Sequence, residues 1–238
     1  MKITAHRGYS GIYPENTMLA FRKAVEAGAD EIELDVQLSK DGRVVVFHDE
    51  TLDRLTNVRG NIRDYDFSEL SKLNVSPGSD KSGFNPIPSL DEYFTWLKTT
   101  NIVTNIELKN SRFYYTGLEE KTIGLITQYG VIDQVYFSSF NHPSLIKCKK
   151  INPAIRCGVL TGTMIGNAGY YVKSSGLDFY HPEIKSLNDE ICANCTDNGV
   201  EINVWTVDDM AGLVRSLNWN CRSVITNYPD VCKNYVRG

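Results

Sequence analysis

The sequence predicts an α/β fold, specifically a (β/α)8 TIM barrel with a small insertion after the second strand. Short β-branched runs alternate along the chain with longer segments of helical periodicity, which is typical of parallel α/β proteins. Eight such units share 238 residues, about 30 residues each, the size of a βα repeat with short loops. An open doubly wound sheet is the alternative, but no glycine-rich dinucleotide loop or Walker motif follows the first strand.

The predicted elements follow one another in strand and helix order. The eight strands cover residues 2–6, 31–38, 103–109, 134–138, 155–160, 177–180, 201–206 and 223–226. The helices that follow them cover residues 17–27, 90–98, 117–129, 143–150, 163–174, 187–198, 208–216 and 229–235. Helix starts are expected at the capping residues Asn16, Ser89 and either Asn141 or Ser144.

One segment departs from the strand and helix alternation. Residues 43–48 form an extra extended run, and residues 49–88 contain Gly60, Gly83, Pro86 and Pro88 without a long helical pattern. A loop of this length inside a compact fold is usually functional. We expect residues 1–238 to form a single domain in which residues 49–88 stand above one end of the barrel.

Composition narrows the function classes. The chain is 42% hydrophobic and 23% charged, which excludes disorder, collagen-like repeats and coiled coil. Its 25 Lys and Arg against 29 Asp and Glu give a net charge of −4 without a dense basic run, which argues against nucleic-acid partners. The first residues do not form a signal peptide, and no apolar run is long enough to span a membrane. We expect a cytoplasmic protein with no stable membrane insertion.

All six cysteines lie in the second half of the chain. They are too few and too unevenly placed for a disulfide scaffold, so we expect reduced thiols. Cys192 and Cys195 have CxxC spacing, but no second pair stands at zinc-ribbon distance. We interpret them as a structural pair on a helix in preference to a redox or metal site.

Carboxylates stand in predicted barrel strands, where residues buried on both faces are normally apolar. In the second strand Glu33 and Asp35 are two residues apart and point to the same side, while the residues between and beside them are apolar. The apolar set must pack against the helices, so the acids face the barrel interior. The third strand repeats the pattern with Glu107 and Lys109, which places three carboxylates and one ammonium together.

Three converging carboxylates repel one another unless a cation neutralises them. Oxygen ligands favour a hard divalent ion, Mg²⁺ or Ca²⁺, over zinc. We therefore expect a divalent cation at Glu33, Asp35 and Glu107. The alternative is a set of partly solvated acids held by Lys109 and Arg7 alone.

Two histidines end extended runs beside these acids. His6 stands in His-Arg-Gly and His48 in Val-Val-Phe-His-Asp. A single histidine at a strand end is more often structural, but two beside an acid cluster indicate a proton-transfer pair, because the imidazole pKa of about 6.5 suits both roles. Arg7 and Lys109 add cationic donors, and the planar guanidinium fits a phosphate. The set points to phosphoryl transfer at an anionic phosphate ester.

Three further residues are less decisive. His142 stands at a helix start and is interpreted as a capping or surface residue. His181 follows the sixth strand, where a structural role and a site role stand equal. Trp205 ends the seventh strand, and core packing and a wall of the substrate pocket are equally supported.

Taken together, these segments resemble the glycerophosphodiester phosphodiesterase family. The likeness spans the chain and is densest in the first 50 residues. The matching segments are His-Arg-Gly at 6–8, Pro-Glu-Asn-Thr at 14–17, Gly-Ala-Asp-Glu-Ile-Glu-Leu-Asp-Val at 28–36, Ser-Lys-Asp-Gly at 39–42, Val-Val-Phe-His-Asp at 45–49, Glu-Leu-Lys at 107–109, Trp-Thr-Val at 205–207 and Thr-Asn-Tyr-Pro-Asp at 226–230.

The resemblance implies a TIM barrel that hydrolyses small glycerophosphodiesters to glycerol 3-phosphate and an alcohol. It implies three groups of site residues: the metal ligands Glu33, Asp35 and Glu107, the acid–base pair His6 and His48, and the phosphate-binding residues Arg7 and Lys109. It further implies that a glycerol hydroxyl attacks phosphorus, giving a cyclic phosphate that water then opens.

Glu15 is expected to orient Arg7, with a role at the helix N-terminus as the alternative. The last strand ends in Thr226 and Asn227, where the family often has an acid.

Two other functions remain open: a lipid-directed, phospholipase D-like enzyme, which an apolar patch on the insertion would favour, and a non-catalytic sensor of phosphodiesters. The head group, the oligomeric state and the ion used in the cell are not predicted.

Overall fold

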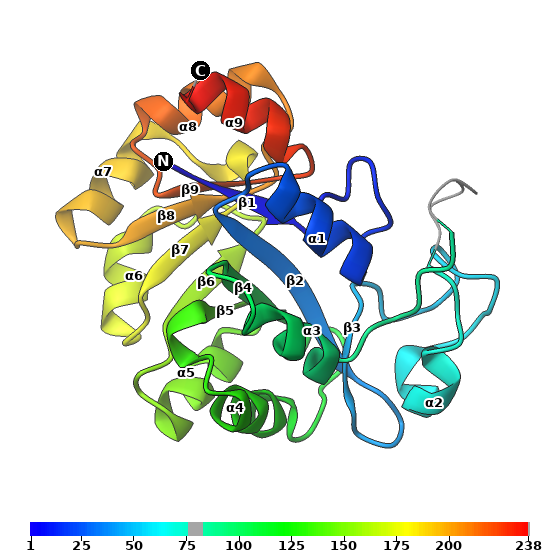
Figure 1. Cartoon of the computed structure of the whole chain (residues 1–238). Helices are drawn as coiled ribbons and strands as arrows, with labels where there is room; N and C mark the ends of the chain where they lie inside the picture. The colour runs from blue at the N-terminus through cyan, green and yellow to red at the C-terminus, as the bar shows by residue number, and fades with distance from the viewer. Residues whose placement is uncertain (76–82, 238) are drawn as a thin grey trace.

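The computed structural model describes residues 1–75 and 83–237 and contains eight parallel strands closed into a barrel (Figure 1). The barrel strands are β1 Lys2–His6, β2 Glu31–Leu38, β4 Val103–Leu108, β5 Val135–Ser139, β6 Cys157–Thr161, β7 Phe179–Pro182, β8 Glu201–Val204 and β9 Ser223–Thr226. Because β1 pairs with both β9 and β2, the sheet has no free edge within the barrel. The TIM-barrel prediction is confirmed, and the open sheet is wrong.

Helices separate the barrel strands along the chain. They are α1 Met18–Glu26, α3 Leu90–Leu97, α4 Leu118–Tyr129, α5 His142–Ile151, α6 Ala168–Ser174, α7 Asp189–Asp197, α8 Met210–Asn218 and α9 Pro229–Arg237. Two short 3-10 helices, η3 Ile132–Gln134 and η4 Ile184–Ser186, lie in the connections. None of the helices in the described ranges is both long enough and apolar enough to cross a bilayer.

The starts of the helices show which polar residues cap them. Ser89 and Asn141 cap α3 and α5, as predicted. The prediction for α1 is wrong, because the N-cap is Thr17, whose side chain accepts a hydrogen bond from the backbone of Ala20 at 3.2 Å. Asn16 instead donates to Asp35 at 2.8 Å, so it supports the site and not the helix.

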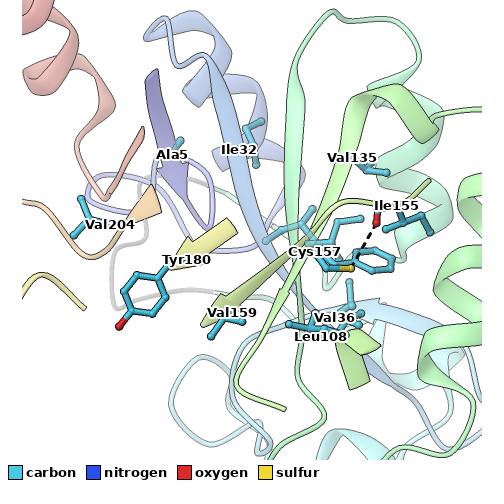
Figure 2. Packing of buried hydrophobic residues seen from close by; sticks show 14 of the residues in the cluster. Ala5, Ile32, Val36, Leu108, Val135, Ile155, Cys157, Val159, Tyr180 and Val204 are labelled. Atoms are coloured by element: carbon cyan, nitrogen blue, oxygen red, sulfur yellow. Dashed lines mark hydrogen bonds between the residues drawn. The ribbon is translucent and has the colours of Figure 1, made fainter. Parts of the chain in front are cut away.

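The main core lies between the barrel strands and the surrounding helices. Alternate residues of β2 belong to it, and Figure 2 shows Ile32 and Val36 in this cluster with Leu108 of β4. All six cysteines are buried in the same cluster and unpaired. Cys192 and Cys195 lie together on α7, where burial raises the pKa of the thiols to about 12 and about 11. These observations agree with the interpretation of a structural pair.

The insertion packs around a smaller core of its own. It follows β3 Val44–Val46, which runs antiparallel to β2, and continues through η1 Ile62–Asp64 and α2 Phe67–Leu70 beside the barrel (Figure 1). The buried residues of this second core are Val45, Phe47, Leu52, Leu55, Ile62, Leu70, Val75 and Ile87. Residues 76–82 of the predicted insertion lie outside the described residues. Because Val46 pairs with Val36 near the end of β2, the insertion starts at the carboxyl end of the barrel.

Candidate active site

The register of three strands brings the predicted acids together at the carboxyl end of the barrel. His6 of β1 lies beside Glu33 of β2, and Asp35 of β2 lies beside Glu107 of β4. Since paired residues of parallel strands point to the same face, all four side chains face inward. Glu33, Asp35 and Glu107 are buried, and one carboxylate oxygen from each lies within 4.8 Å of the others.

The electrostatics of this cluster favour a bound cation. Burial raises the pKa of Glu33 well above its usual value, and repulsion from Asp35 and Glu107 adds to the shift. Burial also raises the pKa of Glu107. Although burial alone would raise the pKa of Asp35, the charges of His48, Lys109 and Arg7 hold it well below its usual range. Asp35 Oδ1 is buried without a hydrogen-bond partner. A divalent ion fits this donor set, because it would both neutralise the three acids and coordinate the unpartnered oxygen.

Arg7 and Lys109 supply positive charge on two sides of the acids. Arg7 has a φ of 55° and is followed by Gly8 at 79°, a left-handed turn that aims the Arg7 backbone N–H at Glu33, at 2.9 Å. Its guanidinium lies 3.6 Å from Asp35. Lys109 Nζ lies 2.9 Å from Glu107 and 3.8 Å from Asp35. Two cationic side chains therefore lie against the three acids.

The ring of His6 is held in one orientation by an amide. Asp208 accepts a hydrogen bond from Asn227 Nδ2 at 2.5 Å, which fixes the amide so that Asn227 Oδ1 faces His6 Nδ1 at 2.7 Å. His6 Nδ1 therefore donates, and Nε2 is left as an acceptor. Burial, with the charge of Arg7, lowers the pKa of His6 to about 4, so the ring is neutral at pH 7. Asn227, at the end of the last strand, thus orients a ring instead of carrying the charge that the family often has there.

His48 is tied to the barrel through the insertion. Its Nδ1 lies 2.6 Å from Asp49, and its Nε2 lies 3.3 Å from Lys109 Nζ. Arg54 donates to Asp49 at 2.6 Å and to Glu15 at 2.8 Å. Although burial alone would raise the pKa of Asp49, the hydrogen bonds from His48 and Arg54 hold it below its usual range.

The same chain of ion pairs continues to Arg7. Glu15 Oε1 accepts from Arg7 at 2.8 Å as well as from Arg54. The expected contact between Glu15 and Arg7 is therefore present, and Arg54 links it to the insertion. The guanidinium of Arg7 and the ring of His48 are thus joined through side chains from two separate parts of the chain.

These side chains surround one cavity of about 230 Å³. Its lining combines the charged groups with apolar and neutral ones: His6, Arg7, Glu33, His48, Asn105, Glu107, Ser138, Phe140, Leu160, Trp205 and Ile225. Asp35 and Lys109 lie next to this lining. A cavity that contains acids, basic groups and two imidazoles can bind an anion and transfer protons to and from it.

Comparison with known proteins identifies the family of the chain. The model of the glycerophosphoryl diester phosphodiesterase family matches residues 6–231. The chain belongs to this family. It is therefore a phosphoric diester hydrolase, and the predicted family is confirmed.

Relatives of the glycerophosphoryl diester phosphodiesterase family align over almost the whole chain. A glycerophosphodiester phosphodiesterase of Bacillus altitudinis is 40% identical over 96% of this chain and 95% of its own length. One from Caldanaerobacter subterraneus is 38% identical, with 99% and 97% covered. The structure of an Oleispira antarctica phosphodiesterase in complex with the product sn-glycerol-3-phosphate has a TM-score of 0.89 at 26% identity, covering 100% of this chain and 97% of that one.

Several residues around this candidate site were not foreseen from the sequence. Asn105 and Ser138 line the cavity, and Arg54 joins Asp49 to Glu15. The sequence pattern could have indicated Asn105, because it stands two residues before Glu107 and therefore on the same face of β4. No such pattern indicates Ser138 or Arg54, since their positions depend on strand register and on the packing of the insertion.

The remaining histidines, His142 and His181, do not line the cavity. His142 is the first residue of α5 and is half-buried, but the capping residue is Asn141; the His142 ring bridges Tyr171 Oη at 2.8 Å and the Leu160 carbonyl at 3.0 Å. His181 is fully buried, and its Nε2 lies 2.9 Å from Asn203 Nδ2. These observations favour the structural role. Trp205 lines the cavity.

Proposed function

We propose that the chain is a metal-dependent glycerophosphodiester phosphodiesterase that releases glycerol 3-phosphate and an alcohol. The observation that carries this proposal is the meeting of three buried carboxylates, two cationic side chains and two differently held imidazoles around one cavity. The names of the relatives and the product bound in the Oleispira antarctica structure support the choice of substrate.

In this proposal Glu33, Asp35 and Glu107 hold Mg²⁺ or Ca²⁺. The ion supplies charge stabilisation for the phosphoryl oxygens when it is bound. Arg7 and Lys109 bind the phosphate, the first through its planar guanidinium and the second as a compact point charge. Both already lie against the acids, at 3.6 Å from Asp35 and 2.9 Å from Glu107, so substrate enters a site in which positive charge is fixed.

The two histidines divide the acid and base roles. The neutral ring of His6 presents Nε2 and is suited to accept the proton of an attacking glycerol hydroxyl. His48, paired with the Asp49 carboxylate, is suited to donate a proton to the departing alcohol. The attack forms a cyclic phosphate, since a hydroxyl held on the same molecule reacts with a large effective concentration. Water then opens the ring while the histidines exchange roles.

The proposal is tested with glycerophosphoethanolamine and glycerophosphocholine, purified protein and added Mg²⁺ or Ca²⁺, with release of glycerol 3-phosphate as the readout. We expect turnover that EDTA abolishes, and a loss of about 10³-fold in kcat for H6A and for H48A. His142→Gln is the matched control, because this histidine is outside the cavity lining, and it should stay within about threefold of wild type. Full turnover by H6A or H48A, or no turnover of either diester by wild type, would refute the proposal.

The lipid-directed alternative receives no support from the insertion. In the described part of residues 49–88, Phe84 is the only large hydrophobic residue that is mostly exposed. The other apolar side chains of this segment pack into its small core or against it. An apolar docking patch of the size that marks lipid or protein contacts is therefore not formed by these residues.

A further inference from the structure

The cavity has a charged side and a neutral side. Its ionic and imidazole groups come from β1, β2, β4 and the segment after β3. The opposite wall comes from β5, β6, β9 and the segments after β5 and β8, and it consists of Ser138, Phe140, Leu160, Trp205 and Ile225. A ligand with one anionic end and one uncharged end would therefore bind in a single direction.

The neutral side offers few polar atoms. Trp205 Nε1 donates to the His181 carbonyl at 2.9 Å, so the indole presents apolar surface to the cavity. Phe140 packs edge-on against Trp205, with ring centroids 5.8 Å apart. Apart from the two histidines, this leaves Asn105 and Ser138 as the uncharged side chains with hydrogen-bonding capacity to spare among the described lining residues.

Asn105 and Ser138 each carry a buried oxygen without a hydrogen-bond partner. Each is 1% exposed, and Asn105 Oδ1 and Ser138 Oγ make no hydrogen bond. Strand register places Asn105 beside Glu33 and Ser138 beside Glu107, so both atoms lie next to the charged side of the cavity. Buried polar atoms are almost always paired, and two unpaired ones lining the same cavity indicate a hydroxyl-bearing ligand.

We propose that Asn105 and Ser138 bind the hydroxyls of the glycerol moiety and so select glycerol esters over other phosphate esters. This inference rests on the proposed function for the direction in which the substrate binds. The phosphate lies against the charged side, the carbons of glycerol contact the apolar wall, and Asn105 accepts a hydrogen bond from a hydroxyl while Ser138 donates or accepts one. The departing alcohol is then left on the open side of the cavity, where it needs no dedicated pocket.

The test compares two monoesters that differ only in their hydroxyls, glycerol 3-phosphate and n-propyl phosphate, by calorimetric titration in the presence of Mg²⁺. Wild type should bind glycerol 3-phosphate at least tenfold more tightly. Asn105→Leu and Ser138→Ala should each lose about tenfold in affinity for glycerol 3-phosphate, and less than twofold for n-propyl phosphate. Mg²⁺ affinity should stay unchanged in both variants.

Ser139→Ala is the matched control. Ser139 is buried on the same strand, but its hydroxyl donates to the Leu108 carbonyl and does not line the cavity, so its loss should lower stability without changing the preference. Equal weakening for both monoesters, weaker Mg²⁺ binding, or an unchanged preference in both variants would overturn the inference. A wild type that hydrolyses the diester while its variants keep the preference refutes this inference alone. A wild type that discriminates between the monoesters but cleaves no diester refutes the proposed function alone.

Discussion

Buried carboxylates lie at both ends of the barrel interior, but they differ in how many hydrogen-bond partners the protein gives them. β2 contributes three inward carboxylates, Glu31 at its amino end and Glu33 and Asp35 towards its carboxyl end. Glu31 is fully buried and accepts hydrogen bonds from Arg222 at 2.5 and 3.1 Å and from Tyr136 at 2.8 Å. Although burial alone would raise the pKa of Glu31, these contacts hold it below its usual value.

The carboxyl end has equal burial but fewer partners. Here burial and like charges raise the pKa of Glu33, and unpartnered buried atoms remain on Arg7, Asp35, Asn105 and Ser138. A buried polar cluster whose groups are nearly all paired specifies structure, whereas one left incomplete has its partners supplied by a ligand. The difference therefore separates a structural cluster from the candidate binding site on the same strand.

The largest expected effect on activity comes from removing one charge at the carboxyl end of the barrel interior, the incomplete end whose buried polar atoms lack partners. Glu33→Gln keeps an acceptor for the backbone N–H of Arg7 but removes a proposed metal ligand, so kcat/KM should fall by about 10³-fold. The metal-free protein should become more stable by about 1 kcal/mol at pH 7, because repulsion among the three acids decreases. Kinetics together with urea unfolding in EDTA check both. Retained activity with lower stability would contradict the comparison.

Removing one charge at the amino end of the barrel interior, the structural end that contains Glu31, should instead lower stability and leave activity nearly unchanged. Arg222→Met leaves Glu31 buried without its main partner and should cost about 3–5 kcal/mol in the free energy of unfolding. Because Arg222 does not line the cavity, kcat/KM of the folded protein should stay within about threefold of wild type. The double variant Glu31→Gln with Arg222→Met should recover most of the lost stability. If the double variant is no more stable than Arg222→Met, the ion pair is not what stabilises this end.

Most of the fold was predictable because strand periodicity is a local property. Every predicted barrel strand is present, but some boundaries moved. The helix predicted at 163–174 begins at Ala168, the strand predicted at 177–180 is Phe179–Pro182, and the strand predicted at 201–206 ends at Val204. Element ends depend on which backbone groups find partners in neighbouring strands, and this is not encoded within the segment.

The site residues were likewise predictable only where a local sequence pattern determines their position. The alternation in β2 and β4 was enough to gather Glu33, Asp35, Glu107 and Lys109 on one face. The position of Ser138 depends on how β5 aligns with β4, and that of Arg54 on how the insertion folds over the barrel. Both positions depend on tertiary structure, and no local pattern in the sequence indicates them.

The smallest expected effect concerns His181, which packs within the structural end against Asn203. Burial and the nearby Arg222 lower the pKa of His181 to about 3. As the pH falls from 6.5, the unfolded chain binds a proton at this histidine that the folded chain does not, so the unfolded state gains by about 1.4 kcal/mol per pH unit.

Between pH 6.5 and pH 4.5, the free energy of unfolding of wild type should therefore fall by up to about 3 kcal/mol more than that of His181→Gln. Urea unfolding at several pH values checks this. The contribution of His6, whose pKa is also lowered, is common to both proteins and cancels. Parallel pH profiles would mean that His181 is protonated in the folded state, and its environment would then resemble the incomplete end of the barrel. Converging profiles would mean that this end excludes a new charge, because the His181 ring is fully buried and lies near the positive charge of Arg222.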